Sequence, residues 1–107
     1  MSTTSSRSPL LADHRNAIDA LCRRHHVRRL DLFGSAARGE ARDGSDYDFL
    51  VEFDALPPGG YTEAYFGLRE DLEALLGAPV DLVVERAIRN PYFLQSVQTD
   101  RKALYAT

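Results

Sequence analysis

The chain has 107 residues, enough for one domain with a modest core and too few for a second domain. Its formal net charge of −3 at pH 7 argues against a broad basic surface, so we exclude long DNA or RNA as the main partner. The basic run 23–29 is interpreted as a solvated junction, and the single cysteine, Cys22, as a core residue that rules out an internal disulfide. No apolar run resembles a membrane span or a signal peptide, so we expect a soluble cytoplasmic protein with no membrane partner.

Hydrophobic spacing predicts an α/β (α+β) domain over residues 9–107, preceded by a polar, serine-rich flexible tail over residues 1–8. The expected elements are a helix over 10–24, a strand over 27–33, a short helix over 36–40, a polar loop over 41–45, a strand over 46–53, a break over 54–60, a helix over 61–76, a strand over 80–84, a helix over 91–98 and a brief edge strand over 103–105. This order favours a small mixed sheet flanked by helices.

The segment 33–48, which reads FGSAARGEARDGSDYD, concentrates residues that are suited to chemistry. Gly34 lets the backbone come close to a ligand, and a helix that begins just after it points unpaired N–H groups at an anion. Asp46 and Asp48 begin the next predicted strand, where alternation points both carboxylates the same way with their backbones roughly 6 to 7 Å apart. Such a pair can bind a divalent cation beside a phosphate.

The pattern G-S-x-x-x-G followed by S-D-x-D resembles the signature of the polymerase-beta-like nucleotidyltransferase superfamily. The matching positions are Gly34, Ser35, Gly39, Ser45, Asp46 and Asp48. The short chain is similar to the minimal branch, the MNT proteins encoded beside HEPN toxins, and the resemblance spans residues 27–105. It implies the nucleotidyltransferase fold and an antitoxin enzyme that moves AMP from ATP to a hydroxyl, with a tyrosine of a HEPN-type toxin as the acceptor.

Nucleotidyl transfer builds up charge that two divalent cations can stabilise, and we expect two Mg²⁺ ions, with Mn²⁺ as a substitute, and ATP as the donor. Asp46 and Asp48 are predicted to be ligands of both ions. The resemblance places the third carboxylate at Asp81, which would share the ion beside the acceptor hydroxyl and help to remove its proton. Gly34, Ser35 and the adjoining backbone N–H groups would hold the triphosphate.

Two further residues are assigned to nucleotide binding. Arg38 could neutralise a phosphate oxygen, although an ion pair with Glu40 or Glu52 is a close alternative. Ser45 is interpreted as a loop cap that orients Asp46 rather than as a direct ligand.

Three other functions stay open from the sequence: a small-molecule nucleotidyltransferase, a non-catalytic antitoxin that works by occlusion, and an α/β domain with a fortuitous acid pair. The first usually needs an extra helical domain, and occlusion needs no metal site. A protein acceptor would dock on exposed aromatic side chains near the site. The candidates are Tyr61, Tyr65, Tyr92 and Phe93, of which Tyr65 fits core packing better. A homo- or hetero-oligomer is compatible with the sequence.

Overall fold

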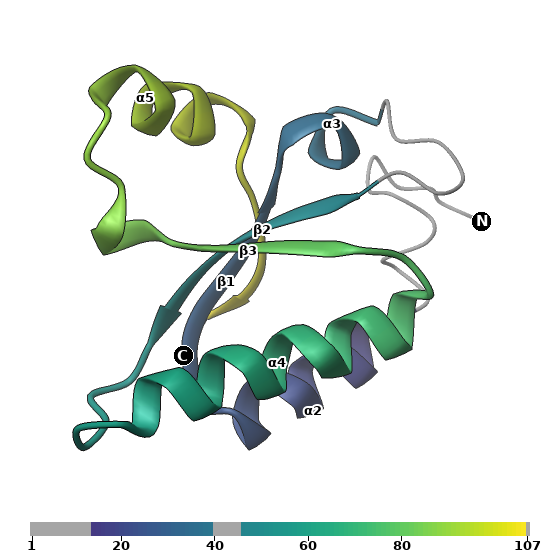
Figure 1. Cartoon of the computed structure of the whole chain (residues 1–107). Coiled ribbons are helices and arrows are strands. Elements are labelled where there is room, and N and C mark those ends of the chain that lie inside the picture. Colours follow the sequence, from purple (N-terminus) through teal and green to yellow (C-terminus); the bar gives the residue numbers. More distant parts are fainter. Residues whose placement is uncertain (1–13, 40–45, 107) are drawn as a thin grey trace.

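The computed structural model describes residues 14–39 and 46–106, so the predicted tail, the start of the first helix and the loop with Glu40 and Ser45 lie outside the described residues. In chain order its elements are α2 (Arg15–Arg24), β1 (Val27–Phe33), α3 (Gly34–Ala37), β2 (Tyr47–Phe53), α4 (Gly60–Leu76), β3 (Val80–Val84), the 3-10 helix η1 (Glu85–Ala87), α5 (Pro91–Asp100) and β4 (Lys102–Ala106) (Figure 1). Among these ranges, no helix has the length and apolar character needed to cross a bilayer.

Four strands form one mixed sheet in the order β3-β2-β1-β4. β1 pairs antiparallel with β2 and β4, whereas β3 runs parallel to β2. The predicted small mixed sheet and its C-terminal edge strand are therefore confirmed. In the register, Asp48 lies opposite Phe33 on one side and opposite Asp81 on the other. The end of β1 and the starts of β2 and β3 thus meet at one end of the sheet.

Helices cover both faces of this sheet (Figure 1). α2 and α4 lie on one face, over the larger core, which includes the fully buried Phe49 and Leu68. α5 lies on the other face, where its Val97 packs with Leu50 in a smaller core. The short α3 follows the end of β1, and its buried Ala36 and Ala37 belong to the larger core. Because side chains alternate along a strand, Asp48 and Leu50 share the α5 face while Phe49 points to the larger core.

Local sequence signals explain where the longer helices begin and end. α5 begins at Pro91 after Asn90, whose side chain accepts hydrogen bonds from two backbone N–H groups of the first turn. α4 ends before Gly77, which adopts the left-handed conformation with φ 65°.

Three details of the helices differ from the prediction. The short helix spans Gly34–Ala37 rather than 36–40, because the left-handed φ of Gly34 turns the chain at once. α5 continues to Asp100 rather than ending near 98, because the N–H of Arg101 still donates to Val97 at 2.9 Å. The single-turn helix Glu85–Ala87 was not predicted.

Two predictions about the N-terminal third hold. Cys22 is fully buried in the larger core, and burial, followed by the nearby charge of Asp19, raises the pKa of its thiol to about 12. The basic run is mostly exposed, as a solvated junction should be. Within it, the half-buried His25 pairs with Asp71 at 2.6 Å, which ties α2 to α4.

Candidate active site

The turn at Gly34 brings the end of β1 against the start of β2. Its φ of 74° is a left-handed conformation that glycine adopts without steric cost. A Cβ placed on Gly34 would lie 3.2 Å from the Asp48 carboxyl carbon and would collide with the Asp48 Oδ2. Both the backbone conformation and the missing side chain are therefore needed for the Asp48 carboxylate to lie directly over this turn.

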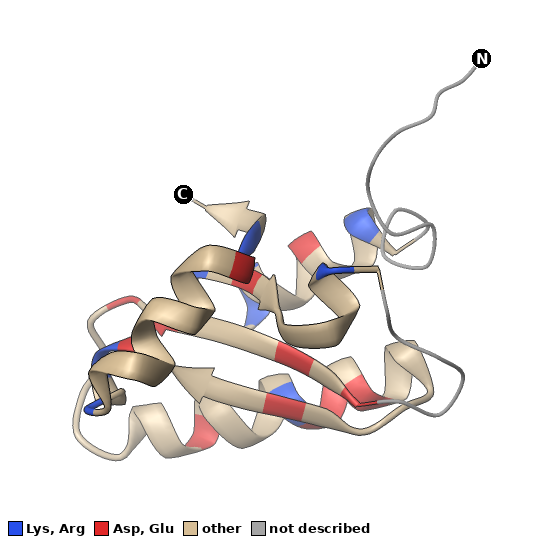
Figure 2. Cartoon of the chain, turned by 90° about the horizontal axis from the view of Figure 1, so that it is seen from above, with Lys and Arg blue, Asp and Glu red and all other residues tan. Residues whose placement is uncertain are grey.

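Three aspartates gather at this end of the sheet. Asp48 and Asp81 are register partners on adjacent parallel strands, and Asp46 precedes β2 by one residue. Figure 2 shows acidic positions, in red, next to one another on neighbouring strands. Partial burial raises the pKa of Asp48, and the negative charges of Asp81 and Asp46 raise it further. The structure thus brings together the three predicted acids within electrostatic reach of one another.

The chemistry of these donors fits a divalent cation. Asp46 and Asp81 are exposed and Asp48 is half-buried, so solvent-borne ions can reach the cluster. Carboxylate oxygens are the ligands that Mg²⁺ prefers, and a cation would relieve the repulsion that raises the Asp48 pKa. Within residues 14–39 and 46–106, no three carboxylate, histidine or cysteine side chains already stand in a coordination arrangement.

Two predicted nucleotide-binding residues lie in or just after α3. Ser35 is half-buried and follows Gly34 in the single turn of this helix. Arg38 is exposed, its positive charge lowers the pKa of Asp48, and its NH1 donates to the Asp100 Oδ2 at 2.6 Å. Of the two alternative partners of Arg38, Glu52 accepts from Arg86 at 2.9 Å, and Glu40 lies outside the described residues.

Sequence reasoning named Phe93 of α5 as a docking candidate but missed Asp100 at the other end of this helix. Phe93 packs edge-on against Phe33, the residue before the glycine turn, with ring centroids 6.0 Å apart. Asp100, at the other end of α5, binds Arg38. The sequence carries one local signal for Asp100, which is its position at the C-terminal end of a helix. A negative charge there is disfavoured by the helix dipole.

An acidic site at the end of a small mixed sheet, beside a glycine turn, offers carboxylates to a cation and backbone N–H groups to an anion. Sequence comparison gives the family: residues 14–104 match the nucleotidyltransferase domain. The chain therefore belongs to this family and is a nucleotidyltransferase.

Relatives and solved structures are similar over nearly the whole chain. A Methanocaldococcus jannaschii protein, provisionally named a protein adenylyltransferase, is 38% identical over 100 residues, which are 94% of this chain and 96% of that protein. A structure provisionally described as a minimal nucleotidyltransferase has a TM-score of 0.72 and 39% identity, covering 92% of this chain and 98% of that chain. A chain in a toxin-antitoxin structure with AMP-PNP has a TM-score of 0.67 and 31% identity, covering 87% and 73%.

Proposed function

We propose that this nucleotidyltransferase moves AMP from ATP to a tyrosine hydroxyl of a HEPN-type toxin and thereby acts as an antitoxin. The observation that carries the proposal is the gathering of three aspartates within electrostatic reach of one another, with the Asp48 carboxylate in the space that a Cβ on Gly34 would fill. The adenylyltransferase name of the archaeal relative and the toxin-antitoxin structure support a protein acceptor.

The residues of the site would have separate roles in this reaction. Asp46, Asp48 and Asp81 would hold two Mg²⁺ ions, which supply positive charge to the triphosphate and to the attacking oxygen. The backbone N–H groups around Gly34 and Ser35 would bind and orient the phosphates.

Transfer then requires one substitution at the α-phosphorus of ATP. The acceptor oxygen forms a bond to that phosphorus, the bond between the α-phosphorus and the oxygen that bridges it to the β-phosphorus breaks, and pyrophosphate leaves. We assign Asp81 as the group that takes the proton of the acceptor hydroxyl. It is the exposed acid on the outer strand β3, so an acceptor from a partner can approach it.

The candidate docking aromatics fall into two places. Tyr92, with 82% of its surface exposed, and Phe93, with 41%, begin α5, and Phe93 contacts Phe33 beside the glycine turn. We assign the docking of the acceptor protein to these two side chains, since they are exposed and belong to the helix that contacts Phe33 beside the glycine turn.

The other two candidates line a groove of about 420 Å³ at the opposite ends of β2 and β3. Tyr61 is exposed there, and Tyr65 is half-buried, with its hydroxyl donating to the carbonyl oxygen of Leu82 at 2.6 Å. This bond agrees with the core-packing interpretation of Tyr65. Neither residue is assigned to the acceptor.

The direct test is to incubate the purified protein with the toxin encoded beside it, Mg²⁺ and ATP labelled at the α-phosphate. We expect the label to appear on a tyrosine of the toxin. The control is Asp48→Asn, which keeps the shape of the side chain and removes its charge. A toxin that is neutralised without label would favour occlusion and overturn the transfer.

A further inference from the structure

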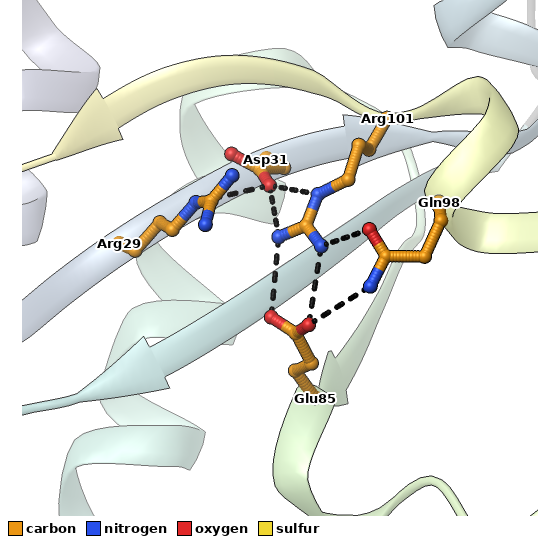
Figure 3. Close-up of polar contacts among 5 residues, drawn as sticks. All are labelled: Arg29, Asp31, Glu85, Gln98 and Arg101. Carbon is orange, nitrogen blue, oxygen red and sulfur yellow. Dashed lines mark hydrogen bonds and ion pairs between the residues drawn. The ribbon is translucent and has the colours of Figure 1, made fainter. Parts of the chain in front are cut away.

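A buried ion-pair network fixes the junction between α5 and β4 (Figure 3). The Nε of Arg101 donates to the Asp31 Oδ2 at 2.5 Å, and its NH2 contacts the same oxygen. Its NH1 and NH2 each reach a carboxylate oxygen of Glu85 at 3.1 Å, and NH1 also donates to Gln98. Asp31 is fully buried, and its Oδ1 has no hydrogen-bond partner among the described residues. Because a buried carboxylate is costly without its cation, Arg101 is held firmly in place.

The residue before this anchor points to the active site. Asp100 is the last residue of α5, and its Oδ2 accepts from Arg38 at 2.6 Å. Only 15% of the Asp100 side chain is exposed, against 45% of the Arg38 side chain. The carboxylate is therefore the better-ordered partner, tied by one peptide bond to the anchored Arg101.

Arg38 links this carboxylate to the acid cluster. It follows α3 directly, and its charge acts on Asp48. A guanidinium has five N–H donors in a planar fork, and Asp100 accepts from NH1. Arginine N–H groups donate to phosphate oxygens in the same planar geometry.

We propose that Asp100 is a positioning residue, which holds the Arg38 guanidinium at the end of α3 so that it is already oriented when the triphosphate binds. The inference rests on the proposed function, because it assumes a nucleotide at the Gly34 turn. A carboxylate near a triphosphate is repulsive by itself, so the role of Asp100 must act through Arg38. Orientation before binding saves the entropy of ordering a long side chain.

The test compares the dissociation constant of AMP-PNP with Mg²⁺ by calorimetry, without any toxin, for the wild type, Asp100→Asn, Arg38→Gln and the double variant. We expect Asp100→Asn to weaken binding about three- to fivefold, the upper part of the range for a half-exposed ion pair. The same change made in the Arg38→Gln background should have no further effect. Glu52→Gln is the matched control, since it removes one charge and one arginine pair away from the site, and its affinity should stay unchanged.

Each outcome separates the inference from the proposed function. Unchanged or tighter binding in Asp100→Asn, or an equal loss in the Arg38→Gln background, would overturn the positioning role. Normal nucleotide affinity without transfer to any toxin would refute the proposed function alone. A wild type that fails to bind AMP-PNP would overturn both. Thermal unfolding of each variant accompanies the titrations, so that a loss of fold is not counted as a loss of affinity.

Discussion

Replacing Gly34 with alanine tests whether the glycine turn and Asp48 form one site. A residue with a Cβ costs roughly 1–2 kcal/mol in the left-handed conformation that Gly34 adopts at φ 74°. The new Cβ would also lie 3.2 Å from the Asp48 carboxyl carbon and collide with its oxygen, so the carboxylate must move. A shift of about 1 Å in a reacting geometry can lower a rate by about a hundredfold. We therefore expect Gly34→Ala to lose about that factor in single-turnover AMP transfer.

Gly77→Ala is the matched control. Gly77 also has a left-handed φ, 65°, but nothing lies within 4 Å of a Cβ built there, and it follows α4 rather than β1. In denaturant titrations, backbone strain should lower the free energy of unfolding by a similar amount in both variants. Gly34→Ala should lose a further amount because its Cβ collides with Asp48. Only Gly34→Ala should lose transfer. Near-normal transfer in Gly34→Ala, or an equal loss in Gly77→Ala, would refute the reasoning.

Three other predictions follow from the charges. Asp48→Asn should abolish transfer, yet at pH 7 without metal it should unfold at a higher temperature than the wild type. The reason is that the pKa of Asp48 is raised, so its ionised form destabilises the fold. The gain in unfolding temperature should vanish in acid, where the side chain is neutral in both proteins. Asp81→Ala should lower the single-turnover rate more than AMP-PNP affinity by calorimetry, and equal losses would contradict its role at the acceptor. Hydrogen bonding to Arg101 lowers the pKa of Glu85. The stability that Glu85 contributes is therefore present above its unfolded pKa and is lost as the pH falls through its lower folded pKa. Glu85→Gln should destabilise the protein at pH 7 and match the wild type in acid, and a difference in chemical denaturation that stays constant with pH would exclude this linkage.

The strands were predictable because their signal is local. The ranges 27–33 and 80–84 agree with β1 and β3, because β1 runs directly into the Gly34 turn and β3 directly follows the break at Gly77 and Pro79. The motif led to Asp46 and Asp48, and the resemblance led to Asp81. The structure brings these three acids together, although their roles stay predictions.

Contacts between distant segments could not be predicted in the same way. Asp100 and Arg38 are 62 residues apart, and no spacing rule links the end of one helix to the turn after another. The sequence did carry a signal for Asp31, which stands between Leu30 and Leu32. An acid within a strand of apolar neighbours must be solvated, paired or metal-bound, and Asp31 is buried and paired with Arg101.

The central claim is transfer of AMP to a protein, and intact-mass spectrometry of the toxin after coexpression tests it most directly. With the wild-type chain, we predict a toxin heavier by one AMP, with the added group mapped to a tyrosine by fragmentation. With Asp46→Asn, which removes one exposed carboxylate from the cluster, the toxin should keep its unmodified mass. A toxin that is neutralised but unmodified with the wild type, or equally modified with Asp46→Asn, would contradict the account.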